Sequence, residues 1–189
     1  IWSDECAAPQ KFFGGKMVPL PSIAGKISPT EIEAGFGPER GVHHALPRVV
    51  SITQPTEVGT IYSLEEMQAL SDFCKERDLI LHVDGARFSN AAAALKVSLA
   101  RLSHQAGIDV LSFGGTKNGA IGAEAVFYFN QDLAEHAAYT RKQATQLASK
   151  MRFISAQFDA LFTDNLWLEN ASHANKMAQL LVSQTADCA

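Results

Sequence analysis

Apolar positions along the chain follow two different periods. Short runs rich in β-branched and aromatic residues are typical of strands, and they lie at 48–54, 79–83, 109–113 and 124–129. Between the first two runs, residues 63–77 instead carry an apolar residue every three or four positions, which is typical of an amphipathic helix. The alternation of strand and helix predicts an α/β fold with a mainly parallel sheet, and its first βαβ unit should be right-handed.

Two short motifs indicate where helices begin. Ser28-Pro29-Thr30-Glu31 and Ser63-Leu64-Glu65-Glu66 each place a glutamate three residues after a serine, which is the pattern of a capping box. Proline at the first helical position strengthens the first motif. We therefore expect helices over 28–36 and 63–77.

The two ends of the chain have a different character. Near the amino end, we expect a short helix or irregular turn around 4–13 and a short strand at 17–20. After residue 131 only helical patterns remain, at 132–149, 153–162 and 164–183. We interpret 1–163 as a large domain and 164–189 as a helix that leads towards a second domain. Because the chain starts without methionine and ends within a helical pattern, we expect an internal fragment of a longer protein.

A lone acid follows the most apolar strand. Residues 79–83 are expected to be buried on both faces, and they run directly into Asp84-Gly85-Ala86-Arg87. Ligands of open α/β sheets bind beyond the carboxyl ends of the strands, so Asp84 and Arg87 should lie at the mouth of a site. The alternatives are ordinary: an aspartate at this point often caps the next helix, and Arg87 could take part in a structural ion pair.

A lysine follows the next strand in a glycine-rich turn, Gly114-Gly115-Thr116-Lys117-Asn118-Gly119. An acid and a lysine at neighbouring strand ends suit a pyridoxal phosphate enzyme, in which the acid pairs with the ring nitrogen and the lysine forms the Schiff base. A lysine amine loses its proton more readily than a guanidinium does, and the Thr116 hydroxyl can donate to a phosphate. Taken alone, Lys117 could equally be a solvated loop lysine.

The remaining candidates are histidines and basic residues. His43 and His44 are adjacent and have no Cys, His or Asp cluster near them, so no metal site is expected. One of the two imidazoles could lie near a cofactor, or both could be surface residues. Four basic residues lie among helical positions, and one of them could reach a cofactor phosphate: Arg141, Lys142, Lys150 and Arg152.

Charge and cysteine content narrow the partner and the compartment. A net charge of −4 with scattered basic residues gives no footprint for nucleic acid, so the expected partner is a small molecule. No apolar run approaches the roughly 20 residues of a membrane span. Cys6, Cys74 and Cys188 are odd in number and far apart, which favours reducing surroundings, with the cytoplasm as the default.

These motifs resemble those of one enzyme family. HVDGARFSNA and SFGGTKNGA are similar to the low-specificity L-threonine aldolases, which are pyridoxal phosphate enzymes of fold type I in the aspartate aminotransferase superfamily. The resemblance extends over the chain, since SITQPTEVGTIYSLEE, SKMRFISAQ and LWLENASHANKMA also read like the bacterial branch. It implies a three-layer α/β large domain and the start of a carboxyl-terminal domain.

The resemblance also implies a role for each site residue. Lys117 carries the cofactor, Asp84 meets its ring nitrogen, and Arg87 helps to hold the substrate carboxylate. Thr116 and Arg152 contact the phosphate, and His43 lies near the substrate hydroxyl as a catalytic base. The family's upstream phosphate loop, its stacking histidine and its second carboxylate-binding arginine have no counterpart in this sequence.

The reaction that the resemblance implies is cleavage of L-threonine, L-allo-threonine and related β-hydroxy-α-amino acids to glycine and an aldehyde. A homodimer or homotetramer is expected, because sites of fold type I are usually completed across a dimer. Two alternatives stay open. One is a pyridoxal phosphate-dependent β-eliminating lyase that acts on an aromatic or sulfur amino acid, and the other is an inactive truncated fragment.

Overall fold

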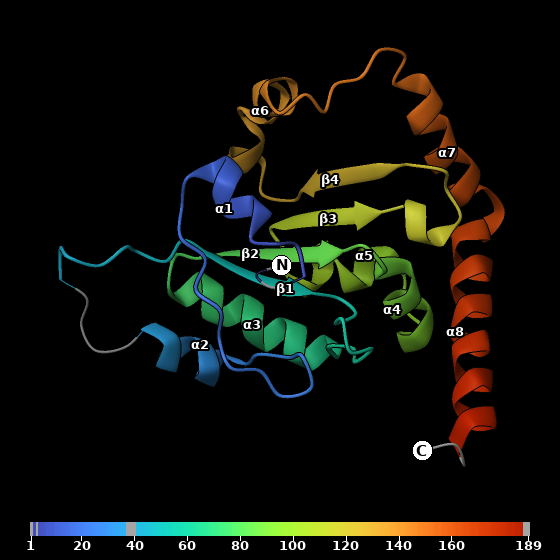
Figure 1. Ribbon diagram of the computed structural model, residues 1–189, viewed down its shortest axis with the longest axis horizontal. Coiled ribbons are helices and arrows are strands. Elements are labelled where there is room, and N and C mark those ends of the chain that lie inside the picture. The colour runs from blue at the N-terminus through green and yellow to red at the C-terminus, as the bar shows by residue number, and fades with distance from the viewer. Residues whose placement is uncertain (1, 3, 37–40, 187–189) are drawn as a thin grey trace.

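A computed structural model describes residues 2, 4–36 and 41–186 (Figure 1). Its centre is a four-stranded sheet in the order β1-β2-β3-β4. The strands β1 (Val49–Thr53), β2 (Ile80–Gly85) and β3 (Val110–Gly114) are parallel, and β4 (Glu124–Tyr128) pairs antiparallel with β3. The predicted α/β fold with a mainly parallel sheet is confirmed.

Helices connect and cover the strands, and most lie close to where the sequence predicts them. The α-helices are α1 (Ala8–Phe13), α2 (Pro29–Phe36), α3 (Leu64–Glu76), α4 (Phe88–Leu95), α5 (Leu99–Leu102), α6 (Ala137–Gln143), α7 (Arg152–Phe162) and α8 (Leu166–Thr185). Single 3-10 turns are η1 (His104–Ala106), η2 (Thr116–Asn118), η3 (Gln131–Ala134) and η4 (Thr163–Asn165). The capping box at Ser63 forms as predicted, since the Glu66 N–H donates to the serine hydroxyl and the Glu66 carboxylate accepts from the Ser63 N–H.

Two predicted elements are wrong. Residues 17–20 form no strand, because Pro19 and Pro21 withhold the N–H groups that a ladder needs; the pairing nearby is an isolated bridge between Ile23 and Lys26. The helix expected over 132–149 is broken into η3 and α6. After α6 the backbone takes left-handed conformations at Thr145 and Lys150, which a continuous helix cannot contain.

One face of the sheet forms the hydrophobic core. Alternate strand residues point into it and are almost fully buried: Val50, Ile52, Leu81, Val83, Leu111 and Phe113. Met67 and Leu70 of α3 and Phe88 of α4 pack on this face and are equally buried. The Phe88 ring meets the Phe113 ring edge to face, with 6.4 Å between ring centres.

The opposite face of the sheet is polar and more exposed. It carries the alternate residues of the same strands, among them Ser51, His82, Asp84 and Ser112. Burial along β2 accordingly alternates between partial and complete. The expectation that this strand is covered on both faces is therefore met on one face only.

His82 joins the three parallel strands on this polar face. Its Nδ1 lies 2.8 Å from the Ser51 hydroxyl of β1, and its Nε2 lies 3.0 Å from the Ser112 hydroxyl of β3. Burial lowers the pKa of His82, and the nearby Asp84 carboxylate opposes that shift. The neutral imidazole can donate to one serine and accept from the other, so both ring nitrogens have partners.

The chain after the sheet is helical and returns to it. The long helix α8 packs along α4 and buries Trp167 and Ala171 near its start (Figure 1). Among the residues that the structure describes, no helix is both long and apolar enough to cross a bilayer.

Because the pKa of His82 is lowered on folding, the unfolded chain binds this proton more tightly than the folded chain does. Its contribution to stability is therefore present above the ordinary histidine pKa of about 6.5 and is lost as the pH falls through that value. Thermal unfolding at pH 7.5 and pH 5.5 should show a smaller drop in Tm for His82→Gln than for the unsubstituted protein. The exposed His44→Gln is the control, and an equal drop in all three proteins would contradict the prediction.

Candidate functional site

The predicted acid and lysine lie at the same edge of the sheet. Asp84 pairs in register with Ser112 on the adjacent parallel strand, so β2 and β3 end side by side. The partly buried Asp84 carboxylate accepts a hydrogen bond of 3.1 Å from the Ala86 N–H. Lys117 follows β3 on the turn η2. Both residues therefore stand at the carboxyl ends of parallel strands, where open α/β sheets bind ligands.

The two turns that carry Asp84 and Lys117 touch through their backbones. A Cβ atom added to Gly114 would lie 2.7 Å from the Ala86 carbonyl oxygen and 2.9 Å from its Cα. A Cβ atom on Gly85 would lie 2.7 Å from a Leu111 methyl group. Glycine is required at position 114 because no side chain fits against the Ala86 backbone, whereas at position 85 the Leu111 side chain would have to move.

The lysine turn presents two polar groups to the outside. Lys117 and Thr116 are both exposed. The Thr116 hydroxyl accepts a hydrogen bond of 3.2 Å from the Ala123 N–H, which leaves its own proton free to be donated to a phosphate oxygen. Gln157 of α7 holds the chain beyond the turn, since its side-chain oxygen accepts from the N–H groups of Ile121 and Gly122 at 2.9 and 3.2 Å.

Arg87 has a partner that sequence reasoning missed. It is the N-cap residue of α4, and its Nη1 lies 3.7 Å from Glu57 Oε1 in the loop after β1. Both side chains are about half exposed, so the pair adds little stability and the guanidinium can still meet another carboxylate. The adjacency of β1 and β2 brings these loops together; Glu57 itself carries no motif that marks it in the sequence.

Among the described residues, two predicted site residues make no hydrogen bond or ion pair with Asp84 or Lys117. His43 is exposed in a turn of the segment 41–48 that leads into the amino end of β1, whereas Asp84 and Lys117 lie at the carboxyl ends of β2 and β3. The length of β1 alone separates those edges by about 13 Å at 3.3 Å per residue. Arg152 begins α7 and is also exposed, with its guanidinium 4.8 Å from the centre of the Phe153 ring.

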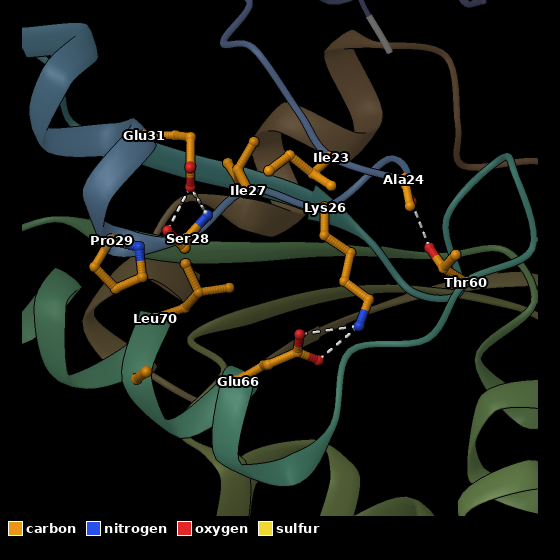
Figure 2. Close-up of a pocket in the computed structure, with 11 residues that line it drawn as sticks. Ile23, Ala24, Lys26, Ile27, Ser28, Pro29, Glu31, Thr60, Glu66 and Leu70 are labelled. Carbon is orange, nitrogen blue, oxygen red and sulfur yellow. Dashed lines mark hydrogen bonds and ion pairs between the residues drawn. The ribbon is translucent and has the colours of Figure 1, made fainter.

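A hollow elsewhere on the molecule lies between residues 23–31 and the start of α3, and it is not this site (Figure 2). Its charged groups are already paired, because Lys26 donates to both carboxylate oxygens of Glu66 and the Ser28 N–H donates to Glu31. The Lys26 ammonium also lies 5.5 Å from the centre of the Tyr62 ring. These interactions join the amino-terminal segment to α3. The charged side chains that line the hollow, Lys26, Glu31 and Glu66, therefore already have partners.

Metal and thiol chemistry find little support in the described part of the chain. No three side chains of His, Cys, Asp or Glu come together there as metal ligands would. Cys6 and Cys74 are free thiols, and Cys188 lies outside the described residues. Burial raises the pKa of the Cys74 thiol to about 11, so it stays protonated and unreactive at neutral pH.

The contact between the turns gives a direct test. Gly114→Ala places a methyl group against the Ala86 backbone, which can yield only if the two turns separate. We expect the free energy of unfolding to fall by about 1–3 kcal/mol, the usual cost of overpacking, in denaturant titrations. Gly122→Ala is the matched control, because its added Cβ meets nothing within 4 Å. Equal stability of the two variants would refute the contact.

Comparisons with known proteins agree on one family. The β-eliminating lyase family matches residues 1–189. The low specificity L-threonine aldolase of a Pseudomonas species is 52% identical over 99% of this chain, and that of Pseudomonas aeruginosa is 50% identical over 99%. The chain spans 54% of the length of each of these two relatives.

Solved structures agree with this result. A threonine aldolase from Leishmania major superposes with a TM-score of 0.91 at 34% identity, over 98% of this chain and 54% of that one. A putative L-allo-threonine aldolase from Listeria monocytogenes shares the fold, with a TM-score of 0.76 at 18% identity over 98% of this chain and 49% of that one. This chain therefore belongs to the β-eliminating lyase family.

Proposed function

We propose that the whole protein uses pyridoxal phosphate to cleave L-threonine, L-allo-threonine and related β-hydroxy-α-amino acids into glycine and an aldehyde. The observation that supports this proposal is the close approach of Gly114 to Ala86, between the segments that carry Asp84 and Lys117. The names of the aldolases that match nearly all of this chain support the choice of reaction. Because the chain spans about half their length, the proposal concerns the whole protein.

The residues at this edge fit the cofactor in kind. When bound, pyridoxal phosphate supplies an aldehyde for an amine and a ring that accepts electrons when a bond to Cα breaks. Lys117 would hold it covalently, and Asp84 would keep the ring nitrogen protonated through a charge-assisted hydrogen bond. The free hydroxyl proton of Thr116 would be donated to the phosphate. Arg152, a cation at the start of a helix where the dipole disfavours it, is the proposed second phosphate contact.

Arg87 is proposed to hold the substrate carboxylate. Its ion pair with Glu57 is long and exposed, so a substrate carboxylate can approach the same guanidinium without the loss of a buried interaction. Holding the carboxylate fixes the rotation about the Cα–N bond. The bond to be broken must stand perpendicular to the ring, and this clamp sets that angle.

His43 is proposed as the base that takes the proton of the substrate hydroxyl, since an imidazole titrates near neutrality. In a single chain it lies in the segment that leads into the amino end of β1, whereas Lys117 follows the carboxyl end of β3. We therefore propose that it serves the site of a second copy, in a homodimer or a homotetramer. Free cysteines at 6 and 74 accord with the cytoplasm as the compartment.

The lysine assignment is tested in the whole protein loaded with pyridoxal phosphate. Borohydride should fix a pyridoxyl group on Lys117, and peptide mapping should find the label there. Lys117→Ala should lose both the label and threonine cleavage, because the amine proposed to bind the cofactor is removed. The exposed Lys75→Ala, in the last turn of α3 before the amino end of β2, is the control and should keep both. A label on another lysine would end the assignment.

The products distinguish the reaction from its alternative. With L-threonine, equal amounts of glycine and acetaldehyde are expected. A keto acid and ammonia from an aromatic or sulfur amino acid, with no glycine from threonine, would instead identify a β-eliminating lyase.

The role of His43 across two copies is tested with mixed dimers. His43→Asn alone should lower kcat at least roughly tenfold, as expected for a positioned acid or base. When Lys117→Ala and His43→Asn subunits are unfolded and refolded together, random pairing gives about one intact site in four, so activity should rise above the sum of the parents. No rise would place His43 in the site of its own chain, and an unchanged kcat of His43→Asn would remove it from the mechanism.

A further inference from the structure

The turn that carries Lys117 has little internal structure to hold it. The 3-10 turn η2 is three residues long. Its own closing hydrogen bonds are those from the Asn118 N–H to Gly115 at 3.0 Å and from the Gly119 N–H to Thr116 at 3.4 Å. Single 3-10 turns have poor hydrogen-bond geometry and depend on their surroundings. What fixes the position of this lysine must therefore come from outside the turn.

The residue after the lysine supplies that outside contact. Asn118 is 5% exposed, whereas Lys117 beside it is open to solvent. The Asn118 side-chain amide donates to the Trp167 carbonyl oxygen at 3.0 Å. The Asn118 main-chain carbonyl in turn accepts from the side-chain amide of Asn170 at 2.8 Å. Both partners belong to the first turns of α8, so the turn is fastened to that helix twice.

Gly119 makes this fastening possible. Its φ is +110°, a conformation that side chains disfavour, and an added Cβ would lie 2.9 Å from the amide nitrogen of Asn170. A side chain at position 119 would therefore meet Asn170, and glycine there lets α8 pack against the lysine turn.

A second asparagine pair fastens the same helix to the other half of the site. Asn90 lies in α4, three residues after Arg87. Its side-chain amide donates to the side-chain oxygen of Asn175 at 3.0 Å. The side-chain amide of Asn175 donates back to the main-chain carbonyl oxygen of Asn90 at 3.0 Å. Asn170 and Asn175 lie about 7.5 Å apart along α8 at 1.5 Å per residue. One rigid helix therefore binds both segments that carry the site.

We propose that Asn118 and Asn170 are positioning residues that hold Lys117 in register with Asp84, with α8 as the rigid reference for both. The proposal rests on the proposed function of Lys117 as the amine that binds the cofactor. A lysine has a long, flexible stem, so the placement of its backbone decides where the amine can react. A displacement of about 1 Å at a reacting group can cost on the order of a hundredfold in rate.

Isosteric substitutions separate this role from simple packing. Asn118→Asp and Asn170→Asp keep the shape of each side chain but set a carboxylate oxygen against the carbonyl oxygen that the amide now contacts. Asn130→Asp is the matched control, because the Asn130 side chain accepts from the Asp132 N–H and a carboxylate can do the same. If either variant does not fold, Asn170→Ser is measured in its place, because the shorter side chain no longer reaches the Asn118 carbonyl oxygen and adds no charge.

The experiment uses the whole protein and has three measurements. In the cofactor-free protein, hydrogen exchange of the amides at 115–120 should quicken in Asn118→Asp and Asn170→Asp and stay unchanged in Asn130→Asp. The rate at which added pyridoxal phosphate binds Lys117 covalently, followed by absorbance, should fall at least about tenfold. Threonine cleavage should lose a similar factor in kcat, while KM stays within about twofold because Arg87 is undisturbed.

The outcomes are distinct. Variants with a lower Tm but wild-type rates of attachment and an unchanged kcat would show that the asparagines serve packing alone, and the proposal would fall. If the unsubstituted protein itself does not attach pyridoxal phosphate at Lys117, the proposed function fails. Hydrogen exchange in the cofactor-free protein then decides whether Asn118 and Asn170 hold the lysine turn. Unaltered exchange in Asn118→Asp and Asn170→Asp overturns the positioning proposal as well.

Discussion

The close approach of two backbone turns, Gly114 against Ala86, is the constraint on which the rest of the site depends. Adjacent parallel strands lie about 4.8 Å apart, so the turns that follow them compete for the same space. Glycine at the end of β3 removes that competition and lets the turns touch. The sheet thereby brings together the backbone segments that carry Asp84 and Lys117. A site held by rigid elements is better placed for chemistry than one held by loops.

The helices that follow the sheet secure this arrangement from outside. On the apolar side, the Phe113 ring of β3 lies 6.1 Å from Phe158 and 6.0 Å from Phe162, which both belong to α7. Past the end of β3, Gln157 of α7 and Asn170 of α8 hydrogen-bond to the segment around Lys117. Gln157 lies 36 residues beyond Ile121 and Asn170 lies 52 residues beyond Asn118, so the lysine turn reaches its final form only when α7 and α8 have packed. The conformation of the lysine turn therefore depends on tertiary packing.

The sequence predicts well what depends on local period and capping. The three parallel strands, the capping box at Ser63 and the lysine turn lie where their patterns place them, because each pattern is a short-range consequence of backbone geometry. The helix predicted over 132–149 fails because α6 ends at Gln143 and the backbone turns left-handed at Thr145, which the residue pattern does not mark.

Partners that meet through folding could not be predicted in the same way. Glu57 meets Arg87, and Asn170 meets Asn118, across long stretches of chain, and neither carries a motif. His82 carries a weaker signal. It lies within an apolar run, yet it stands two positions before Asp84, and the period of two in a strand puts both side chains on one face.

That period also explains how a single strand serves stability and chemistry together. Along β2, Leu81 and Val83 are fully buried in the core, while His82 and Asp84 alternate with them on the polar face. The hydrogen bonds of His82 to Ser51 and Ser112 satisfy both ring nitrogens, so polar residues on this face do not leave unpaired groups beneath the carboxylate. A slip of one residue in register would exchange the two sets and bury the acid in the core. The apolar residues therefore fix the register, and the register in turn decides that Asp84 faces the site.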